Sequence, residues 1–296
     1  MQAAVSLGGR RRTTLRVCGA NTCCVRGADD VFQNLEDLIP PGDVQIGRTA
    51  CFAQCGLGPN VSVSCDEHAA RTHRGIDTVD ATCRLLRRTG VRVPRALKQA
   101  SKLREEAQRA AADDDHAASG TLACLAVQTL DEQPALSGSV AALRLRHKLL
   151  LLQATAARAQ SDEGAGAHAS TWLACAREAR EVQMRLRRAH DSGPHAHLDQ
   201  SAPRLVPAML LEAQAHAHLA AAAARTYDGL HEGDDARPDQ RAVLEATRDA
   251  ADSHREQARE LLAALRQPPY EPAQSRVHRA RLAEKREAER LLREGG

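Results

Sequence analysis

Two short stretches, CGANTCCVRGA at residues 18–28 and CFAQCGLGPN at residues 51–60, hold five of the nine cysteines of this 296-residue chain. Each stretch begins at or just after a run that favours a β-strand, TTLRVC at residues 13–18 and VQIGRTA at residues 44–50. Loops at the ends of adjacent strands can converge in space even when they are distant in sequence. The four cysteines that we expect to face one another are Cys18, Cys23, Cys51 and Cys55.

The pattern over residues 13–92 predicts a small α/β domain in the order strand, helix, strand, strand, strand, helix. Strands are expected at residues 13–18, 44–50 and 60–65, with a fourth short strand within residues 69–76. The first helix is expected within ADDVFQNLEDLI, where apolar residues recur at helical spacing and Asp29 and Asp30 occupy the first turn. The second is expected within DTVDATCRLLRRTG, with Asp77 as N-cap and Gly90 as C-cap.

Four thiolates at one point bind zinc, hold an iron–sulfur cluster or form two disulfides. Zinc sites usually place two residues between paired cysteines, whereas the gaps here are four and three residues. The wider loops favour an iron–sulfur cluster over zinc, with disulfides third. Gly19, Gly56 and Gly58 would let the backbone approach such a cluster and point N–H groups at its sulfurs.

The segments VCGANTCCVRGA, CFAQCGLGPNVSV and RGIDTVDATCRLL together resemble the thioredoxin-like 2Fe–2S ferredoxins. That family includes the small cluster subunit of respiratory NADH dehydrogenase and short ferredoxin-like proteins of photosynthetic microbes and algae. The resemblance covers roughly residues 13–112, and the short stretch between Cys23 and Cys51 places the chain near the compact ferredoxin-like branch. It implies a thioredoxin-like fold for residues 13–92 and a 2Fe–2S cluster with the ligands Cys18, Cys23, Cys51 and Cys55.

The other cysteines are interpreted as structural thiols. Cys24 is an extra residue beside a ligand position, where the related proteins more usually have Arg or His. We expect it not to be a ligand, because adjacent residues rarely direct both side chains at one centre. The remaining four fall on apolar positions and are expected to be buried and inert: Cys65, Cys83, Cys124 and Cys175.

The rest of the chain is expected to be all-α. Residues 93–118 are interpreted as a charged helix, with KLREEAQR facing solvent on most sides, followed by the polar linker AADDDHAASG. Residues 119–296 are interpreted as helical hairpins, which form either a degenerate tetratricopeptide-type repeat or a plain helical bundle. Helices are expected within residues 141–160, 168–190, 203–228, 240–267 and 276–294.

Composition and motifs argue against several classes of protein. Aromatic residues make up only 2% of the chain, and the absence of a basic patch with interleaved aromatics argues against nucleic-acid binding. No run of 18 apolar residues occurs, so no transmembrane segment is expected. The sequence contains no nucleophile–base pair, carboxylate dyad or phosphate-binding loop, which favours an electron carrier or accessory subunit over an enzyme. The pairs His195-x-His197 and His216-x-His218 are interpreted as solvated histidines.

Two functional hypotheses follow from the resemblance. The first is one-electron transfer by a 2Fe–2S protein that is part of, or docked to, a larger redox complex, with protein partners contacted mainly by the helical region. The second is a structural or peripheral subunit of a photosynthetic (photosystem) or respiratory complex. Residues 1–12 are arginine-rich and acid-poor, like the end of an organelle transit peptide, or else form a solvated basic end. The predicted location is an organelle, a plastid rather than a mitochondrion.

Overall fold

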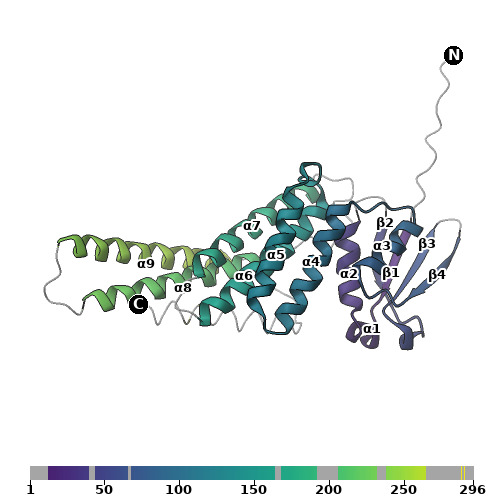
Figure 1. The fold of residues 1–296 in the computed structure, drawn as a ribbon, viewed down its shortest axis with the longest axis horizontal. Coiled ribbons are helices and arrows are strands. Elements are labelled where there is room, and N and C mark those ends of the chain that lie inside the picture. The colour runs from purple at the N-terminus through teal and green to yellow at the C-terminus, as the bar shows by residue number, and fades with distance from the viewer. Residues whose placement is uncertain are drawn as a thin grey trace, which may run out of the picture. The chain divides into compact units, whose positions relative to one another are not determined.

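A computed structural model of the chain describes residues 13–39, 44–65, 68–163, 168–191, 206–231 and 238–264, together with Ala288 and Arg290 (Figure 1). The chain divides into two compact units. The first contains the described residues up to Glu105 together with residues 126–145. The second contains residues 106–125, residues 146–163 and the described segments from residue 168 onward.

The first unit contains a four-stranded mixed sheet with the strand order β2-β1-β3-β4. Its strands are β1 (Thr13–Cys18), β2 (Val44–Thr49), β3 (Asn60–Cys65) and β4 (His68–Arg74). β1 runs parallel to β2 and antiparallel to β3, and β3 runs antiparallel to β4. The strands expected from the sequence are therefore present, including the fourth.

The directions of the strands decide where the cysteine-rich loops begin. Because β1 and β2 are parallel, Cys18 is paired with Thr49 and both strands end at the same edge of the sheet. β3 runs the opposite way, and its pair Val61 with Val17 places its first residues at that edge as well. The loop that follows β1 and the loop between β2 and β3 therefore start side by side.

Two helices of the first unit match the expected ones, and a third was not foreseen. α2 (Ala28–Leu38) contacts β1, β2 and α3 (Val79–Arg88). Its N-cap, Gly27, has φ of +92°, a conformation that glycine adopts without strain. α1 (Asn21–Val25) is a short helix between the first strand and α2 that the sequence pattern did not predict.

The N-cap of α3 differs from the expected residue by one position. The Oγ1 of Thr78, rather than a side-chain oxygen of Asp77, accepts a hydrogen bond from the backbone N–H of Ala81 at 3.2 Å. At the other end the C-cap is Thr89, also one position from the expected Gly90, which follows with φ of +84°.

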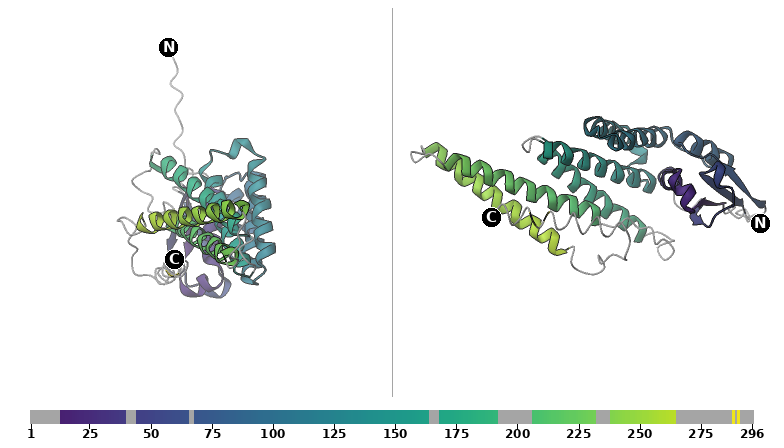
Figure 2. Two further views of the ribbon diagram at one scale, coloured as in Figure 1. Left: turned by 90° about the vertical axis from the view of Figure 1, so that its left-hand side faces the viewer. Right: turned by 90° about the horizontal axis from the view of Figure 1, so that it is seen from below.

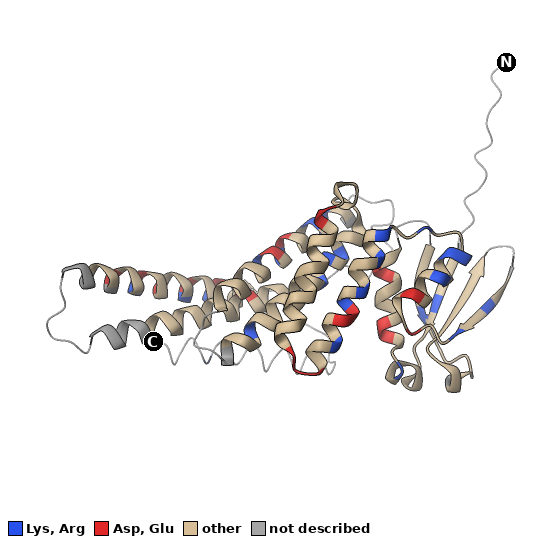
Figure 3. Ribbon diagram, viewed as in Figure 1, with Lys and Arg blue, Asp and Glu red and all other residues tan. Residues whose placement is uncertain are grey.

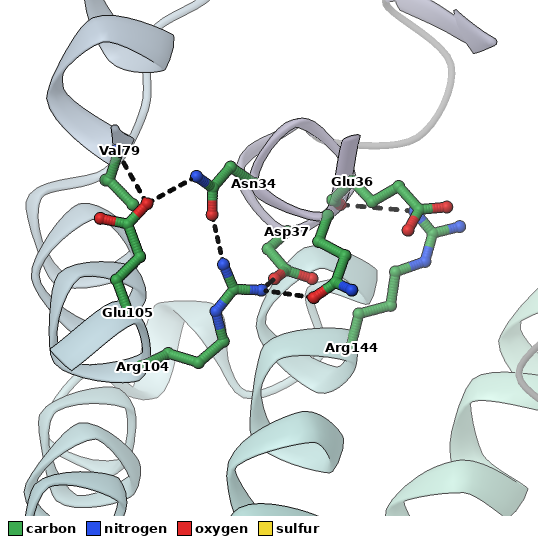
Figure 4. Close-up of polar contacts among 8 residues, drawn as sticks. Asn34, Glu36, Asp37, Val79, Arg104, Glu105 and Arg144 are labelled. Atoms are coloured by element: carbon green, nitrogen blue, oxygen red, sulfur yellow. Dashed lines mark hydrogen bonds and ion pairs between the residues drawn. The ribbon is translucent and has the colours of Figure 1, made fainter. Parts of the chain in front are cut away.

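α4 (Arg95–Ala112) is not the solvated helix that its charged sequence predicts. The side chains of Arg104 and Asp37 are fully buried and form an ion pair at 2.7 Å, and Arg104 also donates to Asn34 (Figure 4). The neighbouring Glu105 accepts from Asn34 Nδ2 at 2.8 Å and from the backbone N–H of Val79 at 3.1 Å. The first half of α4 is thus bound to α2 and to the start of α3.

The remaining described elements are helical, and no strand follows β4 within the described residues. They are α5 (His116–Asp131), the short 3-10 helix η2 (Pro134–Leu136), α6 (Val140–Glu163), α7 (Ala169–Asp191), α8 (Val206–His231) and α9 (Pro238–Ala264). The linker between α4 and α5 is shorter than predicted, because only residues 113–115 separate the two helices and α5 starts at His116. Asp114 has φ of +60° at this break. The helix expected within residues 276–294 lies outside the described residues, apart from Ala288 and Arg290.

Small side chains allow the helices of the second unit to pack closely. Trp172 and Leu173 of α7 are buried among alanines of α6 and α8, which include Ala154, Ala157 and Ala215. α8 and α9 lie side by side as a hairpin (Figures 1 and 2). Charged residues occur along α9, whereas the described part of α8 carries few (Figure 3). None of the helices in the described part of the chain combines the length and the apolar character needed to cross a membrane.

A candidate cysteine centre

The two cysteine-rich loops are bonded to each other where they leave the sheet. The backbone N–H of Gly19, just after β1, donates to the carbonyl of Thr49, the last residue of β2, at 2.8 Å. A Cβ atom at position 19 would lie 3.2 Å from the same carbonyl oxygen. Glycine at this position therefore allows the close approach of the segments that carry Cys18 and Cys51.

α1 gives consecutive side chains different environments. The N–H groups of Cys23 and Cys24 both donate to the carbonyl of Ala20, at 2.9 and 3.0 Å, which closes the first turn. Cys23 is fully buried, Cys24 is partly exposed and Val25 is 88% exposed. The short helix thus directs Cys23 inward, which is the ligand position expected from the sequence.

The Cys18 thiol lies at the centre of this group. Burial by itself raises the pKa of Cys18. Hydrogen bonds from the backbone N–H groups of Ala20 and Phe52 lower the pKa, and so do hydrogen bonds with the thiols of Cys23 and Cys51. The net pKa of Cys18 lies below the ordinary value for cysteine, so the thiolate, which is the form that binds metals, is easier to form here than at an ordinary cysteine.

A second sulfur receives a backbone hydrogen bond from its own loop. The N–H of Ala53 donates to Cys51 Sγ at 3.3 Å, and Ala53 adopts a φ of +57° in this turn. The N–H of Gly19, which was expected to point at the sulfurs, donates to the carbonyl of Thr49 instead, and the same expectation for Gly56 and Gly58 stays a prediction. Around the described sulfurs of Cys18 and Cys51, N–H donors come from residues 20, 52 and 53.

The structure therefore brings together three of the four predicted ligands, Cys18, Cys23 and Cys51. The backbone of Cys55 begins the 3-10 helix η1 (Cys55–Leu57), four residues after Cys51, while its side chain lies outside the described atoms. Among the described side chains, no group of three or more His, Cys, Asp or Glu residues has an arrangement that could hold a metal ion. That set does not include the Cys55 thiol. The donor chemistry fits a cluster, because the adjacent thiols are accompanied by backbone N–H groups that stabilise negative charge on sulfur.

Several groups outside the cysteines hold the loop between β2 and β3. The carbonyl of Gln54 accepts from Asn60 Nδ2 at 2.9 Å, and the side-chain oxygen of Gln54 accepts from Arg74 Nε at 2.8 Å. Arg26 Nη1 donates to the carbonyl of Gly56 at 2.6 Å. Asn60 and Arg26 belong to the motifs that carry the family resemblance, but the sequence pattern did not assign them these contacts.

None of the described cysteines forms a disulfide, although Cys124 lies near enough to Cys175 to act on its pKa. Burial raises the pKa of Cys83, and burial together with Glu178 raises the pKa of Cys175 to about 11. Cys65 is partly buried and lies 3.6 Å from Thr13 Oγ1. The expectation that all four are buried is wrong for Cys124, which is exposed on α5.

One expected solvated histidine is buried instead. His216 of α8 is 1% exposed, with its Nδ1 2.8 Å from Nδ1 of His254 on α9. Arg177 of α7 donates from Nη2 to His216 Nε2 at 3.1 Å. Because a guanidinium only donates, His216 Nε2 is the acceptor and Nδ1 carries the hydrogen that bonds to His254.

The neighbouring histidines do not extend this pair. His218 packs its ring beside Trp172, with 5.8 Å between ring centroids, so His216 and His218 contact different residues. The pair His195-x-His197 lies outside the described residues. Glu212, one turn before His216 on α8, lies 3.4 Å from Arg177 and 3.1 Å from Arg180. The guanidinium groups of Arg177 and Arg180 near His216 oppose the binding of a metal ion there.

In comparisons with protein-family models, with curated protein sequences and with solved structures, nothing matches this chain.

Proposed function

We propose that the first unit binds a 2Fe–2S cluster through Cys18, Cys23, Cys51 and Cys55 and that the protein carries single electrons. The observation that carries this proposal is the contact of the Cys18 thiol with the thiols of both Cys23 and Cys51. These cysteines come from two segments that are far apart in the sequence, and the Cys18 thiolate is favoured by backbone N–H donors.

The topology supports a thioredoxin-like fold for this unit. The observation behind it is the strand order β2-β1-β3-β4, with one parallel pair and two antiparallel pairs. α2 crosses between the parallel strands β1 and β2, and α3 follows β4. The resemblance also supplies the identity of the cluster, because four thiolates alone serve zinc as well.

Backbone N–H groups would stabilise the negative charge of the proposed cluster site, and burial of two cysteines would limit its contact with water. The four cysteines would hold the 2Fe–2S cluster, which would supply one-electron chemistry when bound. The N–H groups of Ala20, Phe52 and Ala53 stabilise negative charge on the Cys18 and Cys51 sulfurs. Burial of Cys18 and Cys23 keeps water from those two sulfurs, whereas Cys51 is exposed and leaves that side of the site open to a redox partner.

Spectroscopy of the anaerobically purified full chain tests the proposal. We expect iron and acid-labile sulfide in equal amounts, visible absorption that bleaches with dithionite, and an S = 1/2 electron paramagnetic resonance signal in the reduced protein only. Serine substitutions at the four ligand positions should each remove or alter that signal. Cys24→Ser and Cys65→Ser are the matched controls and should leave it unchanged. Zinc in place of iron, or a signal that survives Cys18→Ser but not Cys24→Ser, would refute the assignment.

A second proposal concerns partners and is supported by the helical unit. The described helices α7, α8 and α9 bury alanine and leucine side chains among themselves, and Val243 of α9 is 55% exposed. We infer that this region contacts protein partners in a multisubunit redox complex of an organelle. A chain in which all four ligand cysteines are serine should still co-purify with those partners. If it does so without any change in electron transfer through the complex, the role is structural, as in the alternative of a peripheral photosystem or respiratory subunit.

A further inference from the structure

The two cysteine-bearing segments are joined by an arginine side chain as well as by the sheet edge. Arg26 follows α1 directly and lies three residues after Cys23. Its Nη1 donates to the carbonyl oxygen of Gly56 at 2.6 Å, and Gly56 is the residue after Cys55. A single charge-assisted hydrogen bond thus connects the backbone beside the second ligand position with the backbone beside the fourth.

The other contacts of the same loop come from a different direction. Asn60 at the start of β3 and Arg74 at the end of β4 bond to Gln54, and the N–H of Gly75 donates to the carbonyl of Leu57 at 3.0 Å. These contacts fasten the loop to the sheet. Arg26, by contrast, connects the loop to the α1 segment. Its hydrogen bond therefore limits the distance between the two cysteine pairs.

The charge of Arg26 is not neutralised by its bond, because its acceptor is a carbonyl and not a carboxylate. No acidic residue occurs in residues 18–28 or in residues 51–65, and of the two that follow at positions 29 and 30, Asp29 pairs with Arg48. The guanidinium is therefore a positive charge between the two cysteine-bearing segments. Reduction of an iron–sulfur cluster adds a negative charge, and a nearby cation favours that state.

We propose that Arg26 is a positioning residue for the cluster site, which holds the two cysteine segments at a fixed separation and raises the reduction potential. This inference rests on the proposed function, since it presumes the cluster bound by the four cysteines. The geometry gives Arg26 two separable effects. Its hydrogen bond to Gly56 controls how firmly the cluster is retained, and its charge controls the potential.

Three variants of the full chain separate these effects: Arg26→Gln, Arg26→Lys and Arg16→Gln. The last is a control that removes an equal charge from an exposed position on β1, two residues before Cys18. The readouts are iron and sulfide per chain, the rate of iron loss to a chelator, and the midpoint potential from a redox titration followed by electron paramagnetic resonance. Circular dichroism checks that each variant is folded.

For Arg26→Gln we expect iron loss to be about tenfold faster, as for the loss of one exposed hydrogen bond to a charged group, and a midpoint potential more negative than that of the wild type. Arg26→Lys should keep the midpoint potential near the wild-type value, because the positive charge remains. Iron loss should still be faster than in the wild type, because lysine lacks the planar guanidinium with its fixed donor geometry. Arg16→Gln should resemble the wild type in both measurements.

Equal behaviour of Arg26→Gln and Arg16→Gln, in a wild type that holds the cluster, would overturn the role of Arg26 and leave the proposed function intact. A midpoint potential that falls equally in Arg26→Lys and Arg26→Gln would overturn the effect of its charge. A wild type that contains no iron would refute the proposed function itself, and the role of Arg26 with it.

Discussion

Replacing Arg104 by methionine should destabilise the chain strongly, because it leaves a carboxylate buried without its cation. The side chains of Arg104 and Asp37 have no exposed surface, and Arg104 Nη1 lies 2.7 Å from Asp37 Oδ2. Methionine is apolar and close to arginine in length, so the substitution leaves little cavity and little stability is lost for that reason. Removing one partner of a buried ion pair costs about 3–5 kcal/mol.

A double substitution and a surface control make the prediction specific. Arg104→Met combined with Asp37→Leu removes both charges, and since buried pairs can be replaced by apolar residues at little cost, much of the lost stability should return. Lys102 lies on the same helix and pairs with Asp80 at 2.5 Å, but both side chains are about 40% exposed. Lys102→Met should therefore cost less than about 1 kcal/mol.

Urea unfolding of the full chain, followed by far-UV circular dichroism, measures these differences. With a slope of about 2 kcal/mol per molar urea, the single Arg104 variant should lose about 2 M in midpoint. Hydrogen exchange of peptides from α2 and α4 should become faster in the same variant, since these helices carry the pair. The reasoning is refuted if Arg104→Met matches Lys102→Met, or if the double variant is no more stable than Arg104→Met.

Two further predictions concern the second unit. Burial and the nearby Arg177 lower the pKa of His216 to about 4, so the folded chain keeps this ring neutral while the unfolded chain takes up a proton below about pH 6.5. The free energy of unfolding should therefore fall between about pH 6.5 and pH 4, by up to about 3 kcal/mol from this group. Urea midpoints measured across that pH range should fall less in His216→Gln than in the wild type. An equal fall in both proteins would contradict the assignment. Burial raises the pKa of Cys175 to about 11, whereas Cys124 is exposed. At pH 8, mass spectrometry of iodoacetamide-treated protein should find Cys124 modified well before Cys175; the reverse order would show that burial does not control their reactivity.

The parts of the fold that the sequence predicted are those with a clear periodicity. Leu15, Arg16 and Val17 alternate between buried and exposed as a half-buried strand requires. In contrast, α1 spans only residues 21–25, which is too short for a helical pattern to repeat. A short helix of this kind is defined by its contacts, here the bonds of Cys23 and Cys24 to one carbonyl.

The errors have physical causes as well. Arg104 looks solvated in the sequence because a charged residue is rarely buried without a partner, and its partner Asp37 lies 67 residues away. Asp77 and Thr78 are both good N-caps, so composition alone could not choose between them. Within the candidate site, the spacing of the cysteines identified the loops. It could not identify Arg26, whose contact depends on how two distant loops meet.

The pairing of β1 with β2 and β3 also determines when the site can exist during folding. β1 is a central strand of the sheet, and Cys18 pairs with Thr49 across a crossover that contains α2. Contacts over such sequence separations form slowly compared with local helices. We therefore expect the thiols to come together when the sheet forms, and not before it. Under the proposed function, an iron–sulfur donor would meet a chain that is already folded, and insertion of the proposed cluster should then be independent of the folding rate.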